Sequence, residues 1–347
     1  QLMQNGLAPK ALIFHEEEEI LTLGAIVSDQ LFNKKVAILR VSKDIYSDLA
    51  TEDTAEIFEN TLVCGSKTIK LWGLDTETLN LNSTDRRMLN GDQGIANKIA
   101  MEAICKMAAV QSANELIDVT KGHIDGCILA HDANLIFAEK MYKLGANVSI
   151  PTTINAISVN LNNWENQGVE PDFGNKASRL ANAYQKMGAH PTYTCAPYLL
   201  ENKPQRDEVI GWSESNAVIY ANSILGAKTQ KHPDYLDLFI AMTGRAPKAG
   251  VSLTENRIPK IEISVHLPTD FDDSIWPMLG WLIGDLSTNK IPLVTGLEMT
   301  SPSDDDLKAL CAAFGTTSAA PMLHINGHTP GKVYSIPSKL KNFNITK

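Results

Sequence analysis

Short apolar runs and longer amphipathic runs alternate along the first part of the chain. Residues 11–15 (A-L-I-F-H) and the run V-A-I-L-R-V that begins at Val36 predict buried strands, because both are short and apolar. Between them, E-E-E-E-I-L-T-L-G-A-I-V-S-D-Q-L-F predicts a helix with acidic residues in its first turn. The first 60 residues therefore predict a β-α-β unit with parallel strands, which is a small α/β lobe.

The alternation of helices and strands continues beyond a polar connector, L-W-G-L-D-T-E-T-L-N-L-N-S-T, which we interpret as a domain boundary. A helical pattern starts near Ser83 and is broken by Gly91 and Gly94. E-L-I-D-V predicts a strand, G-H-I-D-G a turn, A-N-L-I-F-A-E-K-M-Y-K-L a helix, and N-V-S-I-P-T-T a strand. This order predicts an α/β sheet whose ligand site lies at the carboxyl ends of the strands, where G-H-I-D-G and P-T-T-I-N-A fall.

The last third repeats the same mixture of elements. R-L-A-N-A-Y-Q-K-M-G predicts a helix that ends at Gly188, E-S-N-A-V-I-Y-A-N-S-I-L-G a second helix, and I-E-I-S-V-H-L a strand. Ser303 precedes an acidic turn and Gly315 follows an apolar run, so we expect a capped helix that ends just before Gly315. No nucleotide-binding glycine motif accompanies these elements.

Composition and charge exclude several classes of partner. The 347 residues are 44% hydrophobic, enough for two domains, and carry a net charge of −9, which argues against nucleic acid and anionic membranes as partners. Five scattered cysteines without C-x-x-C spacing argue against a disulfide scaffold or a local zinc motif. No apolar run is long enough to cross a bilayer, so we expect a cytoplasmic protein of undetermined oligomeric state.

Cys195 is the first candidate for chemistry. It lies in P-T-Y-T-C-A-P-Y, where Pro191 and Pro197 restrict the backbone around the thiol. A thiol held in this way suits a metal ligand, although a lone cysteine is more often a buried structural thiol. A nucleophilic role would require a base, and His190 is the nearest histidine in the sequence.

Polar and cationic residues downstream of Cys195 predict an anion site. Ser215, Asn216 and Asn222 lie on one predicted helix, where Ser215 and Asn222, seven residues apart, share a face. Helix capping explains the serines equally well. Lys228 and Arg245 are candidate carboxylate ligands, and a turn around Arg245 would suit a bidentate contact. Thr152 and Asn155 in P-T-T-I-N-A are candidate substrate-binding residues, and His123, near Asp125, is a candidate acid or base.

These motifs together resemble the aconitase X family, a dehydratase branch of the aconitase superfamily. The matching runs are M-L-N-G-D-Q-G-I-A, G-H-I-D-G, I-P-T-T-I-N-A-I-S-V, M-G-A-H-P-T-Y-T-C-A-P-Y, W-S-E-S-N-A-V-I-Y-A-N-S-I-L-G-A-K-T, T-G-R-A-P and H-I-N-G-H-T-P. They cover about residues 85 to 330. The resemblance implies an aconitase-like multi-layer α/β large domain at 61–347, preceded by part of a small swivelling α/β domain at 1–60.

The resemblance also implies a function. Members remove water from small hydroxy acids, either cis-3-hydroxy-L-proline or phosphomevalonate, with an iron or iron–sulfur centre as Lewis acid. Cys195 would be one ligand of that metal. The chain departs from the family pattern at Lys228, Gln230 and Ser252. The serine base of the family and two further cysteine ligands have no counterpart in the sequence, and the tail from Gly331 looks unrelated to the family, so we expect a chain truncated at both ends.

Three functional hypotheses follow. The first is a hydro-lyase acting on cis-3-hydroxy-L-proline or a related hydroxy acid, with weak or no activity in this chain alone. The second is a non-catalytic protein that binds small anions. The third is a thiol enzyme that uses Cys195 as its nucleophile.

Overall fold

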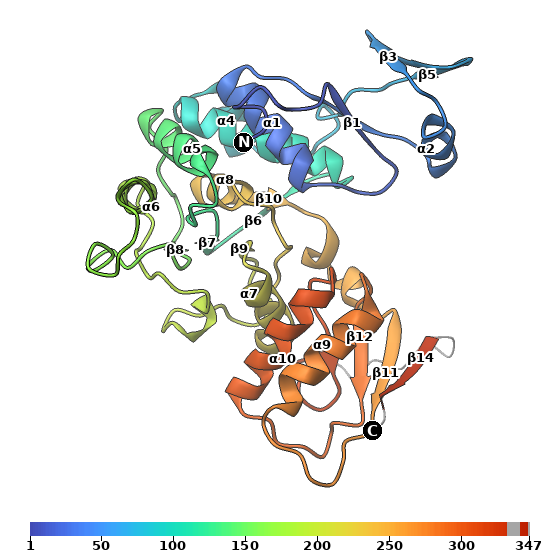
Figure 1. Cartoon of the computed structure of the whole chain (residues 1–347), viewed down its shortest axis with the longest axis vertical. Helices are drawn as coiled ribbons and strands as arrows, with labels where there is room; N and C mark the ends of the chain where they lie inside the picture. Colours follow the sequence, from blue (N-terminus) through green and yellow to red (C-terminus); the bar gives the residue numbers. More distant parts are fainter. Residues whose placement is uncertain (332–340, 346–347) are drawn as a thin grey trace.

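The fold is described from a computed structural model, which covers residues 1–331 and the backbone of residues 341–345. The chain forms an N-terminal half, drawn mostly in blue and green in Figure 1 together with the gold segment 236–249, and a C-terminal half, drawn in orange and red. Buried apolar side chains form one large cluster in each half. Helix α7 (Ser215–Tyr220) contributes to the C-terminal cluster and follows directly from the sheet of the N-terminal half.

The N-terminal segment forms the predicted β-α-β unit. Strands β1 (Ala11–Phe14) and β2 (Ala37–Arg40) pair in parallel, and α1 (Ile20–Phe32) connects them. The helix begins after the acidic run, which corrects the prediction of acidic residues in its first turn. The reason is that Glu18 acts from outside the helix: its carboxylate accepts from the backbone N–H groups of Leu21 (2.8 Å) and Thr22 (2.9 Å).

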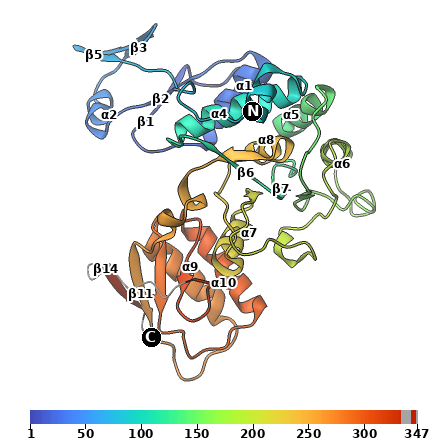
Figure 2. The same ribbon diagram turned by 180° about the vertical axis from the view of Figure 1, so that it is seen from behind.

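A helix and a small antiparallel sheet follow this unit. They are α2 (Lys43–Leu49), β3 (Ala55–Phe58), β4 (Thr61–Cys64) and β5 (Lys67–Lys70). Figures 1 and 2 show this sheet projecting from the N-terminal half, away from the other sheets.

Helices α3 (Ser83–Asn90) and α4 (Ile95–Val110) are separated at the predicted glycines. Gly91 and Gly94 have φ values of 86° and 92°, a region that favours glycine. The centre of α4, from Ala100 to Ala108, is largely buried against α8 (Leu236–Thr243). These two helices form the middle of the N-terminal core.

The central strands form two small sheets instead of one continuous parallel sheet. Strand β6 (Leu116–Asp118) pairs antiparallel with β10 (Arg245–Pro247). Strands β8 (Thr152–Ile154), β7 (Gly122–Ile124) and β9 (Gly211–Trp212) form a parallel sheet in that order, with α5 (Asp132–Lys143) and α6 (Pro171–Lys186) nearby.

The prediction of a turn at G-H-I-D-G was therefore wrong, because its first three residues are the central strand β7. Gly122 is required there by close packing, since a Cβ atom would lie 2.8 Å from Thr152 Oγ1 and 3.2 Å from the Ala241 side chain on α8.

The C-terminal half is a parallel sheet covered by two helices. The sheet order is β13 (His324–Ile325), β12 (Pro292–Thr295), β11 (Ile261–Val265) and β14 (Lys341–Ile345). Helices α9 (Ile275–Ser287) and α10 (Asp304–Thr317) pack side by side on one face (Figure 1).

Helix α10 has the predicted N-terminal cap. Ser303 Oγ accepts from the Asp306 N–H (3.2 Å), and the Asp306 carboxylate accepts from the Ser303 N–H (2.8 Å). The predicted end at Gly315 was wrong, because the helix continues to Thr317. Gly315 instead allows close packing on α7, where a Cβ atom would lie 2.8 Å from Ile219 Cδ1.

Candidate functional site

Three polar side chains meet at the carboxyl edge of the β8–β7–β9 sheet. Asp125 follows β7, Asn155 follows β8, and Glu214 lies two residues beyond β9. The strands are parallel and in register, with His123 opposite both Thr153 and Trp212. We predicted that the motifs G-H-I-D-G and P-T-T-I-N-A lie at the carboxyl ends of the strands. This is confirmed for Asp125 and Asn155, whereas His123 and Thr152 lie within β7 and β8.

Asn155 holds the two carboxylates together. Its Nδ2 donates to Asp125 Oδ1 and to Glu214 Oε2, and its Oδ1 accepts from the Ala156 N–H (2.6 Å). The residue is fully buried. Since its amide is already bonded to three protein groups, the structure shows Asn155 as a bridge between acids, and its predicted contact with substrate remains a prediction.

Burial and neighbouring negative charges raise the pKa of two acids at this edge, Glu214 and Asp237. Burial, followed by the hydrogen bond and negative charge of Asp125, raises the pKa of Glu214 to about 8. Asp237, 1% exposed on α8, accepts from the Asp125 N–H (2.8 Å), and burial together with the charge of Asp234 raises its pKa to about 7. A carboxyl group with such a pKa can give or accept a proton near neutral pH.

Cys195 lies at the same edge of the sheet. Its side chain is exposed, and its carbonyl accepts from Asn216 Nδ2 (3.3 Å), two residues after Glu214 in the sequence. Partial burial of the sulfur and the negative charge of Glu214 raise the pKa of Cys195, while the backbone of Ala156 opposes this shift. A raised pKa keeps the sulfur protonated at neutral pH and argues against the thiol-enzyme hypothesis.

The donor groups of this edge do not form a complete metal site on their own. Within residues 1–331, no three His, Cys, Asp or Glu side chains are arranged to hold a metal ion. Cys127, near the site, is buried, and its thiol faces the carbonyl oxygens of Ile124 and Asn155. The residues described here therefore supply one accessible thiol and do not fit an iron or iron–sulfur centre by themselves.

Asn222 lies away from this edge. The expectation that Ser215 and Asn222 share a helix face was wrong, because Ser215 is exposed and Asn222 is 2% exposed after a π-helical turn at Ala221–Leu225. Asn222 Nδ2 donates to the carbonyls of Thr229 (2.8 Å) and Pro321 (3.0 Å). It therefore connects α7 with a distant loop of the C-terminal half.

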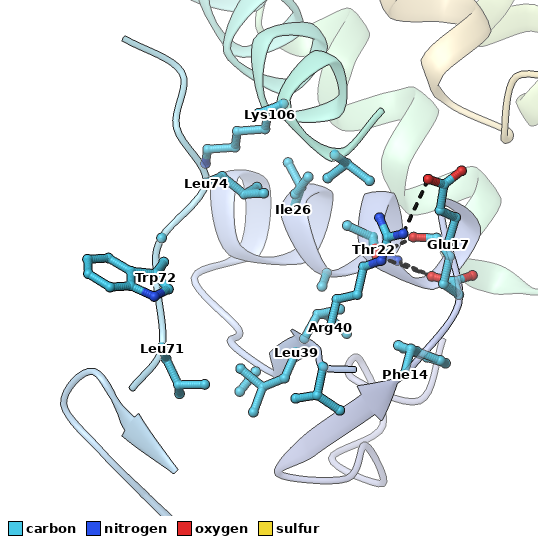
Figure 3. A pocket seen from close by; sticks show the side chains of 18 of the residues that line it. Phe14, Glu17, Thr22, Ile26, Leu39, Arg40, Leu71, Trp72, Leu74 and Lys106 are labelled. Carbon is cyan, nitrogen blue, oxygen red and sulfur yellow. Dashed lines mark hydrogen bonds and ion pairs between the residues drawn. The ribbon is translucent and has the colours of Figure 1, made fainter. Parts of the chain in front are cut away.

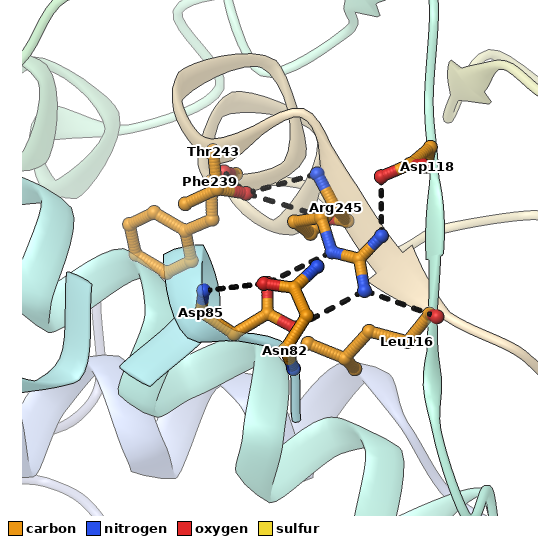
Figure 4. A network of polar contacts seen from close by, with 7 residues as sticks. All are labelled: Asn82, Asp85, Leu116, Asp118, Phe239, Thr243 and Arg245. Atoms are coloured by element: carbon orange, nitrogen blue, oxygen red, sulfur yellow. Dashed lines mark hydrogen bonds and ion pairs between the residues drawn. The ribbon is translucent and has the colours of Figure 1, made fainter. Parts of the chain in front are cut away.

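Arg245 and Lys228 are both paired with protein acids. Arg245 makes the expected bidentate contact, but its partner is Asp85, through Nε to Oδ1 (2.9 Å) and Nη2 to Oδ2 (3.1 Å) (Figure 4). Arg245 also contacts Asp118 and sits in strand β10 instead of a turn, which corrects that expectation. Lys228 forms an ion pair with Asp207 (3.2 Å) and donates to Thr254 Oγ1 (3.1 Å).

His123 and Thr152 point to opposite faces of the sheet. His123 is fully buried, with Nδ1 2.7 Å from Thr153 Oγ1, and burial lowers its pKa to about 3. Thr152 is buried towards α8, and its hydroxyl donates to the Ile150 carbonyl (2.9 Å). Because its pKa is lowered, the His123 imidazole is neutral at physiological pH, and its tautomer decides which nitrogen donates a hydrogen bond and which accepts one.

Two cavities lie in the N-terminal half. One of about 460 Å³ adjoins the β8–β7–β9 sheet and is lined by Thr153, His190 and Trp212 among others. The other, about 1020 Å³, lies between the β1–β2 unit, α4 and the segment around Trp72 (Figure 3). None of the candidate site residues lines this larger cavity, so its size does not connect it with the chemistry at the sheet edge.

Glu214, Asp234 and Asp237 were missed by the sequence reasoning. Glu214 stands in W-S-E-S directly after a short strand, and Asp237 interrupts the apolar run Y-L-D-L-F. An acid inside an apolar helical run is unusual enough to mark a paired or proton-sharing group. The local pattern does not reveal that these acids meet Asp125, because the partners are up to 112 residues apart.

The fold is that of a mixed α/β protein with a cluster of polar side chains at the carboxyl ends of parallel strands. Comparison with known proteins then assigns the family. The domains described as Aconitase X swivel domain, Aconitase X first domain and Aconitase X second domain match residues 1–64, 78–255 and 259–347. The chain belongs to the aconitase X family. The third match extends to residue 347, so the tail that looked unrelated in the sequence is part of the family pattern.

Several characterised proteins are similar over most of the chain. Cis-3-hydroxy-L-proline dehydratases from Hypocrea jecorina and Pseudomonas aeruginosa are 43% and 42% identical, over 95% of this chain and 58% of their own length. The phosphomevalonate dehydratase large subunit of Methanothermobacter thermautotrophicus is 32% identical over 75% of this chain and 64% of its length. The chain thus spans about three fifths of the length of these relatives.

A solved structure has the same fold. The crystal structure of Thermococcus kodakaraensis aconitase X in its holo-form matches with a TM-score of 0.70 and 29% identity, over 77% of this chain and 67% of that one. Among the residues described, no helix combines the length and apolar character needed to cross a membrane.

Proposed function

We propose that this protein is a hydro-lyase that removes water from a small hydroxy acid, with cis-3-hydroxy-L-proline as the preferred substrate. The observation that carries the proposal is the family membership together with the greater similarity to cis-3-hydroxy-L-proline dehydratases than to phosphomevalonate dehydratases. We propose that the active site lies at the polar edge of the β8–β7–β9 sheet.

The residues at this edge suit an elimination reaction. Loss of water requires a proton to leave the carbon next to the carboxylate and another to reach the departing hydroxyl group. The Asp125–Glu214 pair, bridged by Asn155, is proposed as the proton donor for the departing hydroxyl group, because the raised pKa of Glu214 lets it hold a proton near neutral pH. Ser215 and Asn216, at the start of α7, are proposed to contact the substrate carboxylate. Lys228, which lies beyond α7 and is paired with Asp207, is proposed as a further carboxylate ligand.

Cys195 is the one residue of this chain that we propose as a metal ligand. When bound, an iron or iron–sulfur group would supply Lewis acidity to the leaving hydroxyl. Cys195 is proposed as one ligand because its thiol is exposed beside the acids. A cytoplasmic location is part of the same proposal and is supported by five free cysteines, all without a disulfide partner.

The test is a dehydration assay with the purified chain and both substrates, cis-3-hydroxy-L-proline and phosphomevalonate, after anaerobic purification and iron analysis. We expect weak turnover of cis-3-hydroxy-L-proline, because the described residues supply one thiol and not a full set of metal ligands, and a lower iron content in Cys195→Ser than in the wild type. Turnover of phosphomevalonate alone would reassign the substrate. Binding of hydroxy acids without turnover, in a chain without iron, would favour the non-catalytic anion-binding hypothesis instead.

A further inference from the structure

The turn after β7, which carries Asp125, is held from both sides by buried side chains. The Asp125 N–H donates to Asp237 Oδ2 (2.8 Å), and the hydroxyl group of Tyr184 donates to the carbonyl of Gly126 (3.3 Å). Asp237 is 1% exposed and Tyr184 is fully buried, so both contacts are shielded from water. Asp237 belongs to α8 and Tyr184 to α6, so two helices fix this turn.

Helix capping accounts for only one of the two Asp237 oxygens. Oδ1 accepts from the N–H of Leu238 in the first turn of α8 (2.7 Å), whereas Oδ2 reaches across to the turn after β7. Burial and the negative charge of Asp234 both disfavour the ionised form of this carboxyl group. A carboxyl group is costly to bury among other acids, so we connect its presence with the contact to Asp125.

The start of α8 also packs against this turn. Tyr235, directly before the helix, has a φ of 79°, which is strained for a bulky residue. Its ring packs on Phe137 (4.0 Å between centroids), and its hydroxyl group accepts from Asn134 Nδ2 (3.3 Å), so neighbouring groups keep it in this conformation. A Cβ atom added at Gly126 would lie 3.7 Å from Asp234 Cβ, so α8 begins in contact with the turn after β7.

Asp125 depends on this support because the sheet does not fix it. It is half-buried and is the first residue after β7, and its N–H is bonded to Asp237 instead of to a neighbouring strand. Its Oδ1 has to meet the same Asn155 amide that donates to Glu214 Oε2. A displacement of a reacting group by about 1 Å can lower a rate by about 100-fold.

We propose that Asp237 and Tyr184 are positioning residues, which hold Asp125 in the place where it shares the Asn155 amide with Glu214. The inference rests on the proposed function, in which the Asp125–Glu214 pair supplies the proton to the departing hydroxyl group. Both residues are buried and act through the backbone of residues 125 and 126, so neither contacts the substrate. Their loss should lower kcat and leave KM nearly unchanged.

Steady-state dehydration of cis-3-hydroxy-L-proline by matched variants tests this role. Asp237→Leu removes both oxygens, and we expect kcat to fall by about 100-fold with KM changed by less than about twofold. Asp237→Asn keeps one oxygen for the Asp125 N–H and should retain most of kcat. Tyr184→Phe keeps the buried ring and removes one hydrogen bond, so we expect a loss of about 10-fold. The control, Tyr142→Phe on the exposed side of α5, leaves kcat unchanged.

A second measurement does not depend on turnover. Burial, followed by the hydrogen bond and charge of Asp125, raises the pKa of Glu214 to about 8. Carbon-13 NMR titration of glutamate-labelled protein measures this pKa, and Glu214→Gln identifies the signal. We expect the pKa of Glu214 to fall in Asp237→Leu and in Tyr184→Phe, because Asp125 moves away from it. Tyr184→Phe changes no charge, so its effect reports on position alone.

The two measurements separate this inference from the proposed function. An unchanged kcat together with an unchanged Glu214 pKa in Asp237→Leu and Tyr184→Phe would overturn the positioning role and leave the hydro-lyase proposal standing. A raised KM at wild-type kcat would also overturn it, because it would indicate contact with the substrate. A wild-type protein without dehydration activity, in which the pKa of Glu214 still depends on Asp237 and Tyr184, would reject the hydro-lyase proposal and keep the positioning of Asp125.

Discussion

Arg245 and Asp85, 160 residues apart in the sequence, form a buried bidentate ion pair that joins strand β10 to the first turn of α3. The Asp85 side chain is fully buried, and it also caps α3 by accepting from the Asn82 N–H (3.1 Å). A second carboxylate, Asp118, and the Leu116 carbonyl complete the contacts of the guanidinium group (Figure 4). Arg245 therefore binds acids of the protein itself and does not lie at the polar edge of the β8–β7–β9 sheet.

Arg245→Met is expected to destabilise the protein by about 3 to 5 kcal/mol, because it leaves the Asp85 carboxylate buried without a counter-charge. Denaturant unfolding followed by circular dichroism measures this loss. Arg40→Met, which removes a surface ion pair with Glu17 (3.3 Å), is the control and should change stability by less than about 1 kcal/mol. A stable Arg245→Met protein with a raised KM would instead identify Arg245 as a substrate ligand.

Asn155→Asp is expected to lower the dehydration rate by about 100-fold, the usual contribution of a positioned acid or base. The change replaces the donor between Asp125 and Glu214 with a third carboxylate, and the three negative charges repel one another. Because a protonated carboxyl group at this position can still donate, the loss should be smaller at pH 6 than at pH 8. Rates measured across this range for Asn155→Asp and for the exposed control Asn182→Asp would show it, and equal pH profiles would contradict the bridging role.

Cys195 should be the cysteine that reacts with iodoacetamide in the native protein, because the other four are buried. Its raised pKa predicts slow alkylation at neutral pH and faster alkylation as the pH rises towards 9. Mass spectrometry of labelled peptides measures both the site and the rate, and Cys195→Ser should abolish labelling until the chain is unfolded. Rapid labelling of Cys195 at pH 7 would restore the thiol-enzyme hypothesis.

Asp237 predicts a pH dependence of stability. Its folded pKa of about 7 lies above the ordinary value of 3.8, so the folded state holds the proton more tightly than the unfolded state. Its contribution to the free energy of unfolding is therefore present below about pH 4, decreases as the pH rises, and is fully lost above about pH 7. Asp237→Asn lacks one hydrogen-bond acceptor at every pH, but its stability does not depend on the ionisation of this side chain. The difference in Tm between wild type and Asp237→Asn should therefore shrink between pH 5 and pH 8. A constant difference would contradict the raised pKa. The exposed Asp305→Asn serves as control.

Local signals predicted most of the elements, and long-range pairing decided the rest. The glycines that separate α3 from α4 and the Ser303 cap of α10 act within a few residues, so their patterns are visible in the sequence. The three-residue strand β7 is too short to show an alternating pattern, which is why G-H-I-D-G resembled a turn. The partners of Arg245 and Asn222 come from segments that no local pattern connects. The same holds for Glu214, whose importance depends on the amide of Asn155, 59 residues away.

The in-register alignment of β8, β7 and β9 also limits how this family can vary. A single inserted or deleted residue inside any of these strands would turn its inward side chains outward and move the acid or amide that follows it by one position. Three strands of two or three residues have no length in which to absorb such a shift. Changes in length should therefore accumulate in the connecting segments, such as 156–170 and 199–209, while the spacing from each strand to the polar residue after it stays constant among functional homologues.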